Sequence, residues 1–407
     1  MNIFLARQPI FDQRDRTVGY ELLYRTGEEN RFPDVEGNRA TLMILQNIFC
    51  NMGIKEVSGG KQVFINVTRE LLLSDLSFLN PEGLVLEILE DVQVDEALVS
   101  QVKLLKKTGY RIALDDFEDS AETDPLLPLV DIVKVDWRAH PEERIRSICS
   151  RLRGFGVTLL AEKIERAEER QKAHEMGFEL FQGYFFARPR LLKGRNIPVS
   201  QMARFKLMAF LYREDIDLEK VYDVVSRDAG LTVKLLKLIN SAAIGLPTRI
   251  TSIQQAITLL GEKRLRRWLS IIILYDISEN SIPETFRMAV IRAFFMERML
   301  KEKGAEKLRQ PGFLVGLLSM SPALTGMPAK RLLGQIPIHP VIARALLENK
   351  GPLAPFLILC MAYEQGSFSA AAKLAGRLEL PLSSISECYI EAVKEATLLD
   401  SANSPSI

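Results

Sequence analysis

Two adjacent acidic residues, Asp115 and Asp116, follow the short stretch Arg111–Leu114 and precede Phe117. Neighbouring residues of a strand point to opposite faces, so two consecutive acids do not decorate one face of a sheet. At the carboxyl end of a strand, where the chain leaves the sheet, both can turn toward one site. Paired carboxylates suit a hard divalent cation, which prefers oxygen ligands. An Asp-rich turn or a helix cap would use the same residue types, so this stretch alone leaves both interpretations open.

Polar residues also mark other predicted strands in the first half of the chain. β-Rich runs bounded by turn residues predict strands at Val18–Tyr24, Gln62–Val67, Gly83–Ile88, Tyr110–Asp115, Asp131–Val135, Thr158–Ala161 and Glu179–Phe181. Six polar residues lie within or at the end of six different strands: Glu21, Asn66, Glu87, Asp115, Lys134 and Glu162. Residues of this kind gather at one face when parallel strands close into a (β/α)8 barrel.

Helical patterns separate these strands. They cover Asn38–Met52, Asp95–Thr108, Glu142–Arg153 and Arg166–Met176. The recurring order of strand, helix, glycine and strand predicts a mostly parallel sheet, either open or closed. An open sheet would spread six polar residues along a line, since strands lie ~4.8 Å apart. A closed barrel brings them around one mouth, so we predict a (β/α)8 barrel.

The polar set of this barrel suggests a chemistry. Its members are the carboxylates Glu21, Glu87, Asp115, Asp116 and Glu162, the amide Asn66 and the cation Lys134. Such a set exceeds what one Mg²⁺ usually takes from protein and is enough for a two-metal site, which suits phosphodiester hydrolysis. A lysine or glutamate beside the attacking water can orient it or accept its proton. The alternative is a ring of strand-end caps and salt bridges without a metal.

The second half has a different pattern. After the connector 188–198, rich in proline and glycine, apolar residues recur at helical spacing from Gln201–Arg213 to Ser383–Thr397. We therefore expect an α/β domain followed by an all-α domain. The expected boundaries are 1–193 for the barrel, 194–200 for a linker, 201–400 for the helical domain and 401–407 for a tail.

Composition limits the class of protein. The 407 residues are 47% hydrophobic and 26% charged, with a net charge of +1, which favours a globular protein and disfavours a general nucleic-acid binder. The four scattered cysteines, Cys50, Cys149, Cys360 and Cys388, have no CxxC spacing and fit a reducing compartment. The apolar run before Arg7 is too short for a signal peptide, and Trp268–Ile277 is too short to span a bilayer. We expect a cytoplasmic protein without a membrane anchor.

Eight short motifs follow one another in the first half. They are Gln8-Pro-Ile-Phe-Asp12, Tyr20-Glu-Leu-Leu-Tyr-Arg25, Phe64-Ile-Asn-Val67, Leu86-Glu-Ile-Leu-Glu90, Leu114-Asp-Asp-Phe117, Lys134-Val-Asp136, Ala161-Glu-Lys-Ile-Glu165 and Phe181-Gln-Gly-Tyr-Phe185. In this order they resemble the EAL domain of bacterial cyclic-di-GMP phosphodiesterases. The resemblance implies a TIM-like (β/α)8 barrel that binds cyclic di-GMP and cuts one phosphodiester to give linear pGpG.

The resemblance also implies roles for individual residues. Two Mg²⁺ or Mn²⁺ ions would be held by Glu21, Asn66, Glu87, Asp115 and Asp116. Lys134 and Glu162 would position and activate the water. Contacts with the nucleotide would come from Gln8, Arg25, Asp136 and Gln182, with Arg25 pairing with a phosphate, and Glu90 would support the adjoining loop.

This sequence departs from the family pattern in three places. The motif that names the family reads Glu21-Leu-Leu, which keeps the acid. The loop after Phe117 reads Glu118-Asp-Ser120 where active members have Gly-Thr-Gly, and a glutamate does not readily adopt a positive φ. The first two segments between motifs are short, so we expect the barrel to have lost some of its helical cover.

The stretch Arg227–Ala242, followed by Ile253–Gly261, resembles an HDOD domain, a helical relative of the HD phosphohydrolases that lacks their metal ligands. The three histidines precede Pro141, Glu175 and Pro340, so the chain contains no His-Asp pair. We expect Asn240-Ser241 to cap a helix or fix a turn. We expect the basic cluster Lys263, Arg264, Arg266 and Arg267 to form a solvated helix face.

Two functions remain open on this basis. The chain could be a metal-dependent cyclic-di-GMP phosphodiesterase whose helical domain controls homodimerisation or contact with a protein partner. Alternatively, the barrel could be a catalytically inactive receptor or scaffold that acts through protein contacts of the helical domain. The retained acids favour the first function, and the altered loop Glu118-Asp-Ser120 favours the second.

Overall fold

The structure is a computed structural model of the whole chain, and it describes residues 3–26, 58–76, 79–187, 199–213, 217–240, 250–278 and 281–403. The chain divides into two compact units. The first comprises Met1–Arg188 with the short segment Glu364–Ser369, and the second comprises Pro189–Tyr363 with Ala370–Ile407. The expected helix at 38–52 and most of the expected linker, 194–198, lie outside the described residues.

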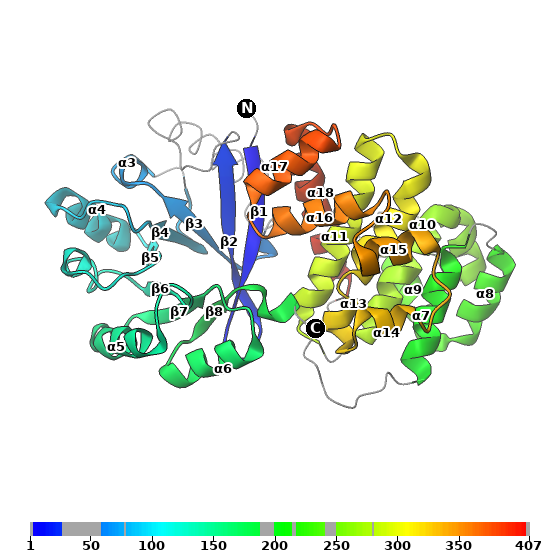
Figure 1. Cartoon of the computed structure of the whole chain (residues 1–407), viewed down its shortest axis with the longest axis horizontal. Helices are drawn as coiled ribbons and strands as arrows, with labels where there is room; N and C mark the ends of the chain where they lie inside the picture. Colours follow the sequence, from blue (N-terminus) through cyan, green and yellow to red (C-terminus); the bar gives the residue numbers. More distant parts are fainter. Residues whose placement is uncertain are drawn as a thin grey trace. The chain divides into compact units, whose positions relative to one another are not determined.

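The first unit is a closed eight-stranded barrel with strands in sequential order (Figure 1). The strands are β1 (Ile3–Phe11), β2 (Thr17–Thr26), β3 (Gln62–Val67), β4 (Leu84–Ile88), β5 (Arg111–Leu114), β6 (Ile132–Asp136), β7 (Thr158–Glu162) and β8 (Leu180–Gln182). β1 runs antiparallel to both neighbours, β2 and β8, whereas all other neighbours are parallel. The predicted barrel is therefore confirmed.

Strand β1 was not predicted, because Arg7, Gln8 and Pro9 interrupt its apolar run. In the barrel, Arg7 is buried with its guanidinium 4.2 Å from the ring centre of Tyr20. This cation–π contact stabilises the buried guanidinium. Pro9 has no backbone N–H to donate to a neighbouring strand. It pairs with Tyr20 of β2 but has no partner on β8, which pairs only with Ile10 and Phe11 of β1.

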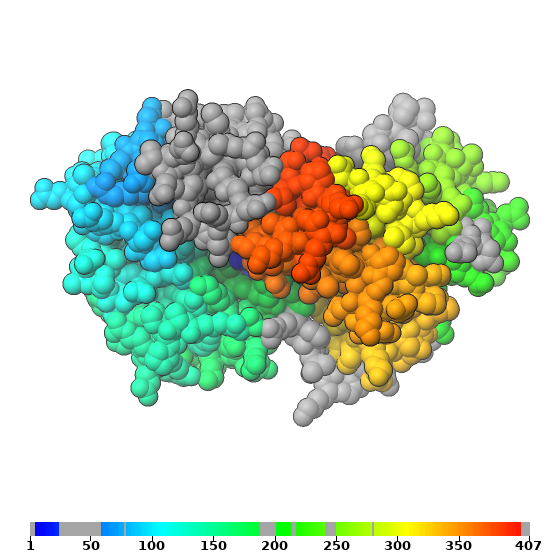
Figure 2. All heavy atoms as spheres, turned by 45° about the horizontal axis from the view of Figure 1, so that its top comes forward, coloured from blue at the N-terminus to red at the C-terminus, as the bar shows by residue number. Residues whose placement is uncertain are grey.

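Three amphipathic helices, α4 (Glu96–Lys107), α5 (Glu142–Leu152) and α6 (Ala167–Met176), cover the outside of the barrel, cyan to green in Figure 2. In α4, the Asp95 carboxylate caps the amide of Leu98 at 2.9 Å, and the buried stripe Leu98, Val102 and Leu105 has helical spacing. Two other crossovers that the structure describes are short. Between β5 and β6 there is only a short 3₁₀ turn, Ala121–Thr123, and α3 (Arg69–Leu72) is one turn long.

The barrel interior is built in two layers. On seven of the eight strands the two members lie two residues apart, and on β2 the position two residues before Glu21 is Gly19. The lower layer is apolar and includes Ile10, Phe64, Val85, Ala113, Ile132 and Leu160, with Val18 and Leu180 packed against it. Because side chains alternate along a strand, the next inward-facing residue toward the mouth is two positions away. These upper residues are Gln8, Glu21, Asn66, Glu87, Asp115, Lys134, Glu162 and Gln182. The strand positions of the apolar residues thus determine which polar residues face the mouth of the barrel.

Gly19 takes the inward position two residues before Glu21 on β2. A Cβ there would lie 2.8 Å from the Phe64 ring and 3.0 Å from the Gln62 carbonyl oxygen. The missing side chain leaves room for Phe64, the largest member of the apolar layer, inside the barrel.

The described residues of the second unit form helices only. These are α7 (Val199–Leu211), α8 (Leu218–Arg227), α9 (Ala229–Ile239), α10 (Ile253–Ile277), α11 (Pro283–Glu302), α12 (Glu306–Leu318), α13 (Ser321–Thr325), α14 (Ala329–Leu333), α15 (Pro340–Glu348), α16 (Ala354–Glu364), α17 (Phe368–Arg377) and α18 (Leu382–Asn403). The predicted fold class, a TIM-like barrel followed by an all-helical domain, is confirmed. Among the described helices, none is both long and apolar enough to cross a membrane.

Asn240 is the C-cap residue of α9, in agreement with the expectation that it caps a helix or fixes a turn. Its side-chain nitrogen donates to the Leu236 and Ile250 carbonyl oxygens at 2.8 and 2.7 Å, and its oxygen accepts from the Ile250 amide at 2.7 Å. Asn240 therefore ties the end of α9 to the residue that opens the next segment. Ser241 lies outside the described residues.

The expectation of a solvated basic face on α10 is wrong for two of its four residues. Arg266 is buried and donates to the Arg213 carbonyl oxygen at 3.2 Å. Arg267 pairs with Glu297 at 2.7 Å and lies over the rings of Phe294 and Phe313. The kink at Gly261, where φ is +68°, changes the direction of the helix before this cluster, so a single helical pattern does not describe it.

Candidate active site

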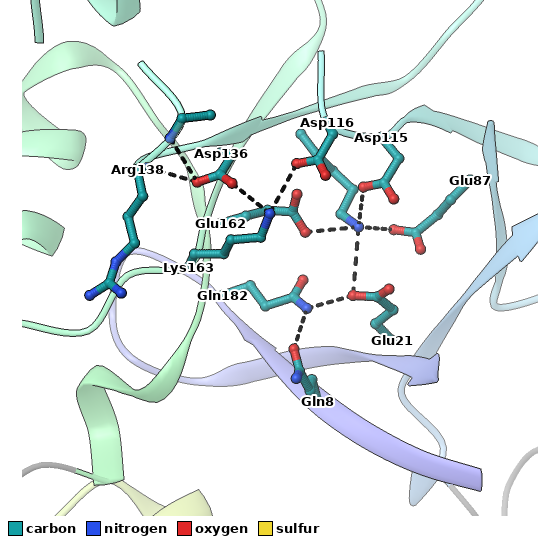
Figure 3. A network of polar contacts seen from close by, with 12 residues as sticks. Gln8, Glu21, Glu87, Asp115, Asp116, Asp136, Arg138, Glu162, Lys163 and Gln182 are labelled. Carbon is teal, nitrogen blue, oxygen red and sulfur yellow. Dashed lines mark hydrogen bonds and ion pairs between the residues drawn. The ribbon is translucent and has the colours of Figure 1, made fainter. Parts of the chain in front are cut away.

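The mouth of the barrel is centred on the ammonium group of Lys134, which is fully buried on β6. Four carboxylates from four other strands or strand ends point toward it (Figure 3). The distances from Nζ are 2.7 Å to Asp115, 2.8 Å to Glu87, 2.9 Å to Glu162 and 3.6 Å to Glu21. The structure therefore brings together residues that are up to 141 positions apart in the chain, Glu21 and Glu162.

Charge is unbalanced in this cluster, because four carboxylates face one ammonium. Burial lowers the pKa of Lys134, but the surrounding acids outweigh it and hold that pKa well above its ordinary value. Burial raises the pKa of Glu87 well above its usual range, against the charge of Lys134 and with the help of Glu21 and Asp115. The pKa of Glu162 is raised in the same way by burial, with Lys134 opposing it. The site has a surplus of negative charge in a poorly solvated place.

Side-chain amides orient Glu21. Asn66 donates to its Oε1 at 3.0 Å, and Gln182 donates to its Oε2 at 2.5 Å. The same amide nitrogen of Gln182 also lies 3.0 Å from Gln8 Oε1. Gln182, which the resemblance assigns to the nucleotide, thus also holds the Glu21 carboxylate in place, and Gln8 in turn contacts Gln182.

The two consecutive acids separate at the end of β5. The Asp115 amide donates to the carbonyl oxygen of Ile88 on β4 at 2.9 Å, and the Phe117 amide donates to the carbonyl oxygen of Lys134 on β6 at 3.0 Å. Between them, Asp116 adopts a positive φ of 38°, which lets the amides on either side of it reach strands on opposite sides of β5. Asp115 therefore points to Lys134, and Asp116 points to the edge of the site.

A second lysine meets Asp116 at that edge. Lys163 Nζ lies 3.5 Å from Asp116 and 2.5 Å from Asp136 (Figure 3). Asp136 in turn accepts the backbone amides of Arg138 at 2.7 Å and Ala139 at 3.2 Å. Lys163 was not among the predicted site residues, although its position directly after Glu162 is a signal that could have identified it.

The altered loop after Phe117 is held by ion pairs. Asp119, and not Glu118, has the positive φ, 56°, which aspartate tolerates better than most residues. Its carboxylate pairs with Arg144 at 3.1 Å and also with Arg151, and Arg151 pairs in addition with Asp124. The steric objection to Glu118 therefore does not apply, because Glu118 does not adopt a positive φ. In addition, Arg144 and Arg151 of α5 support the loop through Asp119.

One candidate residue, Glu90, lies apart from this network, and the side chain of another, Arg25, is not described. Arg25 belongs to β2, but its side chain is outside the described part of the chain. Glu90 lies just beyond β4 with an exposed side chain. Partial desolvation, together with the charges of Asp116 and Asp115, raises the pKa of Glu90, so it contributes to the negative field of the mouth.

Among the described residues, no group of three or more His, Cys, Asp or Glu side chains could hold a metal ion as it stands. Lys134 lies where these carboxylates converge. The donors nevertheless fit divalent cations in their chemistry, since they are oxygens with surplus negative charge. Glu87 Oε2 is buried and has no hydrogen-bond donor in the part of the chain that the structure describes. A divalent cation bound at the mouth would satisfy this oxygen.

Comparison with known proteins identifies both units. Residues 42–189 match the family model of the EAL domain, and residues 197–321 match that of the HDOD domain. YuxH of Bacillus subtilis (strain 168) is 34% identical over 403 residues, which cover 97% of this chain and 98% of YuxH. Cyclic di-GMP phosphodiesterase CdgJ of Vibrio cholerae serotype O1 is 32% identical over 393 residues, which cover 96% of this chain and 91% of CdgJ.

Among solved structures, the Bacillus subtilis YkuI protein, which has an EAL domain and was solved with c-di-GMP and calcium, is 24% identical. The match covers 64% of this chain and 72% of that one, with a TM-score of 0.39. The two sequence relatives match over nearly their whole length and in both halves. The chain therefore belongs to the family of proteins in which an EAL domain is followed by an HDOD domain.

Proposed function

We propose that the barrel binds cyclic di-GMP at its mouth and hydrolyses one phosphodiester to give linear pGpG. The observation that carries this proposal is the convergence of four buried carboxylates on Lys134, with a surplus of negative charge. The name of the Vibrio relative, a cyclic di-GMP phosphodiesterase 32% identical to this chain, supports the choice of substrate.

The cofactor in this proposal is Mg²⁺ or Mn²⁺. The residues that would hold it are Glu21, Asn66, Glu87, Asp115 and Asp116. Two such cations, when bound, stabilise the charge on the attacking and leaving oxygens of a phosphodiester. They would also offset the charges of Glu21 and Asp115, which add to the effect of burial in raising the pKa of Glu87.

The chain's own residues account for the proton transfers. Glu162, which is buried and has a raised pKa, is suited to accept a proton from the attacking water. As the water oxygen bonds to phosphorus, the bond to the ribose 3′-oxygen breaks, and that oxygen becomes a hydroxyl by taking up the proton that Glu162 accepted, relayed through solvent. The Lys134 ammonium, 2.9 Å from Glu162, stabilises the negative charge that develops on the phosphoryl oxygens.

The helical unit has a different role in this proposal, as a site for homodimerisation or for a protein partner. Its single histidine, His339, caps α15 by accepting the Val341 amide at 3.3 Å. This use fits a structural role and supplies none of the paired histidine and aspartate ligands of the helical phosphohydrolases.

Turnover by the full chain tests the barrel proposal. Purified protein with Mn²⁺ or Mg²⁺ should convert cyclic di-GMP to pGpG, and Glu21→Ala should lose this activity by roughly a thousandfold. Saturable binding of cyclic di-GMP without product would contradict hydrolysis and would favour a receptor. Absence of binding would leave a scaffold.

Support of the loop by α5 gives a further prediction. Arg151→Met removes the partner that Asp119 and Asp124 share, so the loop that follows Asp116 should lose its fixed position. We expect kcat to fall about tenfold while Mn²⁺ still binds, because catalysis depends on the placement of the acids. The matched control is Arg146→Met on the same helix, which breaks only the exposed pair with Glu142 and should leave kcat unchanged. Equal kcat values for Arg151→Met and the unmodified chain would contradict this role of the loop.

A further inference from the structure

Lys163 follows Glu162 directly and has an unusual backbone. Its φ is +58°, in the left-handed region that residues with a Cβ seldom adopt. This conformation brings the side chain of Lys163 to the edge of the mouth, on the side of Asp116 and Asp136 (Figure 3). A strained conformation at a site points to a use for the residue that adopts it.

The two contacts of Lys163 differ in strength. The pair with Asp136 is short, 2.5 Å, and Asp136 is mostly buried, with 13% of its side chain exposed. Backbone amides of Arg138 and Ala139 fix Asp136 from the other side. The pair with Asp116 is longer, 3.5 Å, and both side chains are partly exposed, 51% for Lys163 and 37% for Asp116. Asp136 anchors the ammonium, and Asp116 receives it loosely.

The cations of the mouth are therefore divided between two groups of acids. Lys134 neutralises the inner acids Glu21, Glu87, Asp115 and Glu162, and Lys163 neutralises the outer acids Asp116 and Asp136. Of the residues proposed to hold divalent cations, Asp116 is the one that faces this second ammonium. A divalent cation that approaches Asp116 meets a positive charge fixed beside it by Asp136.

From this arrangement we propose that Lys163 is a positioning residue that competes with a divalent cation for Asp116. This proposal rests on the proposed metal-dependent function. It adds that the two divalent cations bind at the mouth with unequal affinity. The cation nearest Asp116 must displace a tethered ammonium, whereas the ammonium itself remains bound to Asp136. Lys163 thereby sets the concentration of Mg²⁺ or Mn²⁺ at which the site is filled.

The test is a titration of the full chain with Mn²⁺ alone, followed by the electron paramagnetic resonance signal of free Mn²⁺. Lys163→Met removes the charge and keeps a Cβ, so the cost of the positive φ is unchanged. We expect the weaker Mn²⁺ binding step to become about threefold to tenfold tighter, as for the loss of a partly exposed charge beside a cation site. Lys163→Arg should keep the weaker binding of the unmodified chain.

Two controls separate competition from a general effect. Lys172→Met breaks a similarly exposed pair, with Glu142 at 2.9 Å on the outside of the barrel, and should change neither step. In an Asp116→Asn background, Lys163→Met should no longer tighten binding, since the two residues act through each other. Thermal unfolding of each variant checks that the fold is retained.

The outcomes distinguish this inference from the proposed function. If the unmodified chain binds Mn²⁺ and Lys163→Met leaves both steps unchanged, the competition is refuted and the metal-dependent function stands. If neither the unmodified chain nor any variant binds Mn²⁺, the metal-dependent function itself fails and the inference fails with it.

Discussion

Replacing Lys134 with methionine should stop hydrolysis of cyclic di-GMP and destabilise the metal-free barrel by about 3–5 kcal/mol. The ammonium is buried and lies within 2.9 Å of Glu87, Asp115 and Glu162, so its removal leaves buried carboxylates facing one another. Saturating Mn²⁺ should recover most of the lost stability, because the cation takes over the charge balance. It should not restore turnover, which we expect to fall by at least about a hundredfold.

Chemical denaturation of the metal-free protein, with and without Mn²⁺, measures this effect. The matched control is Lys106→Met, which breaks a lysine–carboxylate pair of 2.5 Å with Asp131. Both of its side chains are partly exposed, so we expect a loss below about 1 kcal/mol. A Lys134→Met variant as stable as the Lys106→Met variant without metal would show that the carboxylates do not depend on the ammonium.

Replacing Gly183 with alanine should disrupt the same site through the backbone. Gly183 has φ of +139°, and a Cβ there would lie 2.1 Å from the carbonyl oxygen and 2.5 Å from the nitrogen of Ile164. Neither atom can move freely, because the Ile164 amide donates to the backbone carbonyl oxygen of Gln182, and the Ile164 carbonyl oxygen accepts from the amide of Phe185. We expect a loss of about 3 kcal/mol in unfolding free energy. Activity should fall more than about tenfold, since Gln182 orients Glu21.

Gly177→Ala separates the contact from the conformation. Gly177 also has a positive φ, 102°, but a Cβ there would meet nothing within 4 Å. The control should therefore lose only about 1 kcal/mol, the cost of the positive φ, and should keep its activity. Equal losses for Gly177→Ala and Gly183→Ala would mean that the close approach to Ile164 has no energetic consequence.

Alternation along strands explains how much of the site could be predicted from the sequence. Val85 and Glu87, or Ile132 and Lys134, are separated by one residue, so each strand carries its apolar and its polar inward residue in a fixed relation. The polar residues at the predicted strand ends therefore include the carboxylates that converge on Lys134. The closed barrel followed from the same pattern, because only closure gathers these ends.

Features that depend on contacts between distant residues could not be predicted in this way. Strand β1 contains Arg7, which is placed by the ring of Tyr20 on the neighbouring strand. The partial burial of Arg267 depends on its ion pair with Glu297 of another helix. The support of the loop by Asp119 depends on a positive φ and on Arg151 of α5, neither of which has a local pattern. In each case the decisive partner lies far along the chain.

Hydrolysis of cyclic di-GMP by the full chain in H₂¹⁸O with Mn²⁺, followed by mass spectrometry, distinguishes a phosphodiesterase from a receptor. We expect pGpG with one ¹⁸O atom in its terminal phosphate, and no such product from Glu21→Ala. Labelled pGpG would show that water attacks phosphorus in a reaction that depends on the acidic ring. Cyclic di-GMP recovered intact from protein that binds both it and Mn²⁺ would contradict the account and make the barrel a receptor.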